Sequence, residues 1–147
     1  MFRGSSNHTI DTKGRIIVPA RFRDVIRTGG EGLMVSSMDG CLVAYSHDEW
    51  RKIEAKILSL AERSDNMRRF RRVFIGGAHA CNADKQERIL IPPTLRQYAG
   101  LDKEIVLVGV LDHFEIWARE KWDDEHARLE DEMKNEEVRN EIAKLGL

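Results

Sequence analysis

The chain has 147 residues, of which 41% are hydrophobic and 33% are charged, and its formal net charge is −1. This composition excludes a disordered or a membrane-embedded chain, and no apolar run approaches the roughly 18–20 residues that a membrane span needs. The opening residues lack the apolar stretch of a signal peptide, so we expect a cytoplasmic protein.

Charge is divided unevenly along the chain. Residues 1–80 carry 14 Lys and Arg against 9 Asp and Glu, a net +5, whereas residues 81–147 carry 10 against 16, a net −6. This division predicts a basic working face and an acidic tail, and the basic half could bind nucleic acid. Cys41 and Cys81 lie in dissimilar contexts, which favours reduced thiols over a disulfide.

One segment of the chain occurs twice. The residues from Asp11 to Arg23 return 73 positions later between Asp84 and Arg96, with Asp, Arg, three branched aliphatic residues, Pro and a second Arg in register. This period exceeds the roughly 20–50 residues of a solenoid repeat. The sequence therefore predicts an α+β fold made of two half-domains related by a pseudo-twofold axis.

Hydrophobic periodicity predicts the elements in chain order. In the first copy we expect strands at 7–12 and 15–18, a helix from Pro19, strands at 33–38 and 41–45, a helix from 47 broken at 64–66, and a helix over 67–75. In the second we expect strands near 79–84 and 88–91, a helix from Pro92, strands at 104–110 and 113–118, and a charged helical tail from Arg119 to about Lys144. These elements suggest a first domain at 5–52, a helical connector at 53–77, a second domain at 78–122 and a tail at 123–147.

The first repeated turn holds the strongest candidate site. Gly14 can adopt the positive φ that a tight turn requires. Asp11 is predicted to accept hydrogen bonds from the turn backbone and to pair with Arg15, a structural role that we also assign to Asp84. Lys13 and Arg15 are predicted to face phosphates or base edges, because arginine suits bidentate contact with phosphate or guanine.

The second turn departs from the first at Glu87, which stands where the first copy has Gly14. A positive φ costs a non-glycine residue about 1 kcal/mol, so we expect this turn to differ in shape. The carboxylate would also repel phosphate, and Lys85 would compensate only in part. We therefore expect the second hairpin, with Arg88, to be the weaker contact.

Other clusters favour structural interpretations. The four arginines within residues 68–72 could bind phosphate, although such a helix face is more often solvated or in contact with another subunit. His79 and Cys81 lack the further ligands that a zinc site needs, so we expect no metal and no cofactor. The sequence contains none of the hydrolase, phosphate-loop or dinucleotide-binding motifs, which argues against an enzyme and against a small-molecule substrate.

Together these motifs resemble the MraZ family of bacterial transcriptional regulators, which are built from two SpoVT/AbrB-type domains. The similarity covers nearly the whole chain and includes residues 1–4, 11–15, 95–101 and 106–109. It implies a homo-oligomeric ring that binds short G-rich direct repeats in the promoter of the division and cell-wall gene cluster and commonly represses that cluster.

The resemblance also implies that particular residues contact DNA. Lys13 and Arg15 match the first motif of the family, and Arg88 matches the second. The family usually keeps a glycine before that second arginine, and Glu87 breaks this pattern.

The main hypothesis is therefore a nucleoid-associated regulator that contacts double-stranded DNA through Lys13, Gly14 and Arg15, with Arg3, Arg88 and Arg21 assisting. The alternative, motivated by acidic residues 119–147, is a ring-forming protein-interaction module whose DNA binding is vestigial. RNA binding is a weaker third option, because the aromatic residues fall mainly on predicted core stripes and leave no platform for base stacking.

Overall fold

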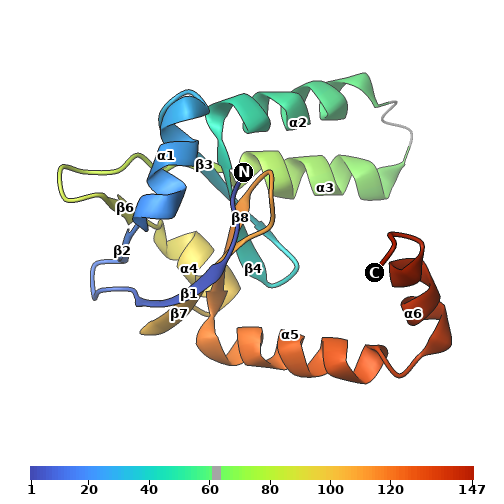
Figure 1. Cartoon of the computed structure of the whole chain (residues 1–147). Coiled ribbons are helices and arrows are strands. Elements are labelled where there is room, and N and C mark those ends of the chain that lie inside the picture. Colours follow the sequence, from blue (N-terminus) through green and yellow to red (C-terminus); the bar gives the residue numbers. More distant parts are fainter. Residues whose placement is uncertain (61–63) are drawn as a thin grey trace.

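The computed structural model describes residues 1–60 and 64–147 (Figure 1). The first copy contains β1 (Ser5–Thr9), β2 (Arg15–Ile17), α1 (Ala20–Thr28), β3 (Leu33–Met38), β4 (Cys41–Ser46), α2 (His47–Ser59) and α3 (Asp65–Gly76). The same order returns as β5 (His79–Ala80), β6 (Arg88–Leu90), α4 (Pro93–Ala99), β7 (Glu104–Gly109), β8 (Phe114–Ala118), α5 (Arg119–Glu132) and α6 (Glu136–Ala143). The sequence repeat is therefore a structural repeat, and the predicted α+β class is confirmed.

The strands of the two copies are interleaved in one antiparallel sheet. Among the described residues its order is β1-β7-β8-β4-β3-β5, which is unchanged when every strand is exchanged for its counterpart in the other copy. The β4 and β8 strands meet at the centre, with Val43 opposite Glu115, its own counterpart. At the edges, β1 pairs with β7 and β5 pairs with β3. The predicted pseudo-twofold axis thus passes between β4 and β8.

A second, smaller sheet joins the repeated hairpins. The β2 and β6 strands pair antiparallel, with Ile16 opposite Ile89, Arg15 opposite Leu90 and Ile17 opposite Arg88. We call this pair the β2–β6 ribbon. Ile16 and Ile89 are fully buried beneath it and are counterparts in the two copies, so the same axis passes through the ribbon. Both hairpin loops project from the same side of the molecule (Figure 1).

Both faces of the large sheet are covered, because successive residues of a strand point to opposite faces. On one face, Leu42 and Leu107 pack under the ribbon and under Phe22 of α1. On the other face, Val43 packs with Trp50 of α2 and with side chains of α3 and α5. This arrangement holds the ribbon on one side of the sheet and the long helices on the other.

Several boundaries differ from the expected ones. The β1 strand ends at Thr9 rather than at residue 12, because the chain then enters a turn organised by a side chain. The helix expected from residue 67 begins at Asp65, because the Ser64 hydroxyl caps it by accepting a hydrogen bond from the Met67 N–H at 3.3 Å. The charged tail forms two helices, and Asn135 caps the second. No helix in residues 1–60 and 64–147 is both long and apolar enough to cross a membrane.

Candidate nucleic-acid interface

The first hairpin turn is organised by one carboxylate. Oδ1 of Asp11 accepts hydrogen bonds from the N–H groups of Lys13 and Arg15, at 3.0 and 2.8 Å, and Oδ2 accepts from Nε of Arg15 at 2.6 Å. These are the bonds that the sequence predicts. The backbone hydrogen bond from Arg15, with further help from its guanidinium, lowers the pKa of Asp11. The carboxylate is therefore charged at neutral pH and orients the arginine.

The second turn repeats this geometry, so the expected difference in shape is wrong. Oδ1 of Asp84 accepts from the N–H groups of Gln86 and Arg88, at 2.8 and 3.0 Å, and Oδ2 accepts from Nε of Arg88 at 3.0 Å. The φ of Glu87 is 62°, on the same positive side as the 90° of Gly14. The hydrogen bonds to Asp84 offset the conformational cost that the sequence argument assigned to a non-glycine residue.

Each turn is also tied to the other copy. The carbonyl oxygen of Glu87 accepts from the Val18 N–H at 3.0 Å, and that of Gly14 accepts from the Ile91 N–H at 2.8 Å. These two bonds are counterparts under the pseudo-twofold axis. Each turn is thus fixed both by its own aspartate and by the opposite strand, which presents the two arginines on a rigid support.

The outward face of the ribbon carries two arginines and two apolar side chains. The side chains of Arg15 and Arg88 are 30% and 27% exposed, and Ile17 and Leu90 are 55% and 56% exposed. Because Arg15 lies opposite Leu90 and Ile17 opposite Arg88, the arginines occupy one diagonal and the apolar side chains occupy the other. This face combines two braced cations with apolar surface over a narrow two-stranded support.

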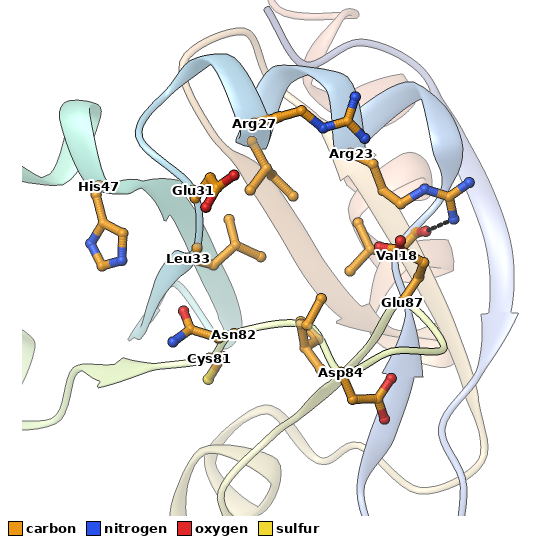
Figure 2. A pocket seen from close by; sticks show the side chains of 14 residues that line it. Val18, Arg23, Arg27, Glu31, Leu33, His47, Cys81, Asn82, Asp84 and Glu87 are labelled. Carbon is orange, nitrogen blue, oxygen red and sulfur yellow. Dashed lines mark hydrogen bonds between the residues drawn. The ribbon is translucent and has the colours of Figure 1, made fainter.

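The two turns differ in what packs against them. A Cβ added at Gly14 would lie 2.6 Å from Nη1 of Arg96, so Arg96 packs directly against the first turn. Its counterpart, Arg23, instead donates from Nη1 to the Val18 carbonyl at 3.1 Å, close to Glu87 (Figure 2). A cavity of about 500 Å³ remains beside the second turn. Glycine at position 14 therefore leaves room for Arg96 against the first turn, whereas Arg23, near Glu87 in the second turn, contacts the Val18 carbonyl instead.

The structure does not place every predicted residue on the ribbon. Nε of Arg21 donates to the Arg3 carbonyl at 3.1 Å, and Nη2 donates to Oγ of Ser6 at 2.8 Å, so this guanidinium faces the N-terminal segment. Arg3 precedes β1 at the end away from the first turn. The structure thus places Lys13 in the same turn as Arg15 and places Arg88 on the strand paired with that of Arg15, whereas Arg3 lies apart from the first turn.

The arginine cluster of residues 68–72 also lies apart from the ribbon. It belongs to α3, whose Phe74 packs in the core on the opposite face of the large sheet. The cluster therefore cannot extend the ribbon surface within one subunit.

Sequence comparison agrees with this repeated architecture. The family model described as "MraZ protein, putative antitoxin-like" matches residues 1–73 and again residues 74–143. The chain belongs to the MraZ family. It is 64% identical to the transcriptional regulator MraZ of Desulforapulum autotrophicum and 56% identical to that of Desulfosudis oleivorans, over 100% of both chains in each case. The protein of the same name from Pelotomaculum thermopropionicum is 44% identical over 100% of this chain and 99% of the relative. The predicted family resemblance is confirmed.

Two surface residues of this MraZ-family chain were missed by sequence reasoning. Ile17 and Leu90 were treated as parts of aliphatic runs and not as candidate contacts. The available signal was strand alternation: Ile16 and Ile89 face inward, so their neighbours in the same strand face outward.

The structure gives no support to a metal site. Within the described ranges, no group of three or more His, Cys, Asp and Glu residues is placed to hold a metal ion. Cys41 and Cys81 are free and buried, and burial raises the pKa of Cys81 to about 11, which keeps this thiol protonated at neutral pH.

Proposed function

We propose that this chain is a transcriptional regulator that binds double-stranded DNA through the β2–β6 ribbon. The observation that carries the proposal is the outward pair of Arg15 and Arg88, each oriented by an aspartate. A two-stranded ribbon fits the major groove, which is about 12 Å wide, and arginine can read guanine there or bind the adjacent phosphates. The relatives named transcriptional regulators support the same role.

The charge of the turns argues for binding by several subunits together. The two turns and their flanking residues carry four cations against three carboxylates: Lys13, Arg15, Lys85 and Arg88 against Asp11, Asp84 and Glu87. These two segments of one subunit have a net charge of only +1, and Arg96 and Arg23, which lie against the turns, add two further cations, so the phosphate contacts of one subunit are few. A homo-oligomeric ring would present several ribbons to one DNA molecule and convert weak contacts into usable affinity.

In this proposal the protein represses the promoter of the division and cell-wall gene cluster by binding short direct repeats. It acts in the cytoplasm at the nucleoid and requires no cofactor. Lys13, Gly14 and Arg15 form the stronger contact, and the Arg88 turn forms the weaker one, because Glu87 adds a negative charge beside it. Arg3 and Arg21 have at most an assisting role.

The second candidate is a ring-forming interaction module with vestigial DNA binding. The observation that favours it is the acidic region formed by α5 and α6. The structure describes every residue of these two helices, and none of their side chains is buried. Such a surface could dock another protein. The two candidates differ in whether removing a ribbon arginine weakens DNA binding.

The test is a titration of DNA from the native upstream region at two salt concentrations, measured by fluorescence anisotropy. We expect Arg15→Ala to weaken binding by about tenfold or more, because a bidentate arginine contact contributes about 1–3 kcal/mol. The matched control is Arg51→Ala on α2, which also removes one exposed arginine but lies away from the ribbon. Unchanged affinity in Arg15→Ala would falsify the ribbon as the DNA-binding surface and favour the interaction module.

A further inference from the structure

The two exposed apolar side chains of the ribbon occupy equivalent places in the two copies. Ile17 and Leu90 are 73 positions apart, and both lie on the outward face at more than half exposure. Single exposed apolar residues are common and need no explanation. Here the two exposed side chains form a symmetric pair, and each lies directly opposite an arginine. This arrangement indicates that the ribbon surface contacts an apolar group of its partner.

We propose that Ile17 and Leu90 contact thymine methyl groups in the major groove, beside the arginines. This inference rests on the proposed DNA binding and names part of what the ribbon reads. The thymine methyl is the apolar group that base edges expose in that groove, and aliphatic side chains recognise it. The neighbouring Arg15 and Arg88 favour a polyanionic partner such as DNA. An apolar protein surface is disfavoured, because it would have to bury both guanidinium groups.

The dimensions of the ribbon agree with this occupant. Paired strands lie about 4.8 Å apart, and alternate residues of one strand lie about 6.7 Å apart. The second distance is close to two base-pair steps of about 3.4 Å each. A strand that follows the groove therefore places Arg15 and Ile17 about two base pairs apart, and the other strand does the same with Arg88 and Leu90 in the reverse direction.

Asp11 and Asp84 help Ile17 and Leu90 to select thymine, because they restrain the neighbouring arginines. Each aspartate accepts a hydrogen bond from the Nε of its arginine and so restrains the guanidinium beside its own turn, while Ile17 and Leu90 are 55% and 56% exposed. Ile17 and Leu90 then remain open to the groove. The ribbon is thus specific for sequences in which a thymine lies at a fixed distance from the base pair or phosphate that the arginine contacts.

The experiment replaces single thymines by deoxyuridine, which lacks only the 5-methyl group. Footprinting of the wild-type protein first locates the site, and each thymine in it is then replaced in a separate synthetic duplex. We expect wild-type affinity to fall roughly fourfold for each contacted methyl group, the effect of exposing about one CH₂. Ile17→Ala or Leu90→Ala should bind the thymine and deoxyuridine duplexes equally at the position that its side chain contacts.

Two further variants separate the contact from indirect effects. Ile17→Val keeps a branched side chain and should retain sensitivity to the methyl group. Leu58→Ala on α2, where the side chain is 69% exposed, removes a similar apolar group away from the ribbon and should behave as wild type in this comparison.

The other outcomes overturn the inference in distinguishable ways. If no replacement changes wild-type affinity while Arg15→Ala still weakens binding, the protein binds DNA but Ile17 and Leu90 do not read thymine. If Ile17→Ala loses the oligomeric state by light scattering, this side chain serves a subunit contact. If the wild type does not bind its upstream DNA even at low salt, the proposed function fails and this inference fails with it.

Discussion

At the scale of single residues, two different side chains occupy the same turn conformation. Gly14 adopts a positive φ without a side chain, whereas Glu87 adopts one because the turn backbone is fixed by Asp84. The two turns differ in the arginine that packs against them. Arg96 packs against the glycine, and no hydrogen-bond partner of its buried Nε lies in the described part of the chain. The first turn is therefore sensitive to added volume, and the second is not.

We expect Gly14→Ala to lower the free energy of unfolding by about 1–2 kcal/mol, because the new side chain would adopt a disfavoured φ and displace Arg96. The measurement is urea denaturation. The matched variant is Glu87→Gly, which removes the strain from the second turn but adds freedom to the unfolded chain, so its stability should change by less than about 1 kcal/mol. Equal stabilities of Gly14→Ala and wild type would show that Arg96 does not constrain the first turn.

At the scale of elements, the two copies keep the same order but differ in how tightly their helices are held. Trp50 of α2 and Phe74 of α3 are buried and stack at a centroid distance of 5.3 Å. Their counterparts α5 and α6 bury no residue, although all their positions are described. Trp122 anchors the start of α5 through its contact with Trp117, at a centroid distance of 6.0 Å. The end of the tail therefore contributes little to the fold of one subunit.

Deleting residues 134–147, which removes α6, should change the free energy of unfolding by less than about 0.5 kcal/mol, as expected when no buried contact is lost. By contrast, Phe74→Ala should cost about 3–5 kcal/mol, because it empties a buried aromatic site. Both are measured by chemical denaturation at a protein concentration where the oligomeric state is known.

The same deletion distinguishes the uses of the tail. If DNA binding survives while light scattering shows that assembly fails, α6 serves subunit contacts. If neither changes, the tail serves an outside partner. A large loss of subunit stability would contradict the exposed position of α6.

At the scale of the whole molecule, the pseudo-twofold axis gives one subunit two equivalent arginines. The axis passes between β4 and β8 and again through Ile16 and Ile89, so Arg15 and Arg88 lie on either side of it. If the ribbon binds DNA as proposed, both hairpins would therefore face the same DNA segment. Because their summed charge is small, the affinity of the protein should depend on how many subunits engage one duplex.

We accordingly expect a duplex with several repeats to bind at least tenfold more tightly than a duplex of equal length with one repeat, because linked sites raise the effective concentration. The comparison uses titration at fixed salt, and the control duplex carries scrambled sequence in place of all repeats. Equal affinity for one and for several repeats would contradict cooperative engagement of an assembled protein.

Local features of the fold were predictable from the sequence. The Asp-x-x-x-Arg spacing predicted the hydrogen bonds of the first turn, because the donors and the acceptor lie within five consecutive residues. It also predicted a structural role for Asp84, but the shape of the second turn was predicted wrongly from Glu87. The alternation and helical periodicity predicted the order of elements, with errors of a few residues at most ends, but they did not predict the break between α5 and α6. The charges alone did not reveal that Arg21 faces the N-terminal segment, since that contact joins residues 15 or more positions apart.

The sequence by itself determined the repeat, the α+β class, the turn chemistry and the family. Only the tertiary structure decided that the strands of the two copies interleave and that the hairpins pair through Ile16 and Ile89. Pairing between strands more than 70 residues apart depends on the simultaneous burial of apolar residues from both copies, which no local window contains. That pairing turns Ile17 and Leu90 outward beside Arg15 and Arg88, and so it creates the surface that we propose meets DNA.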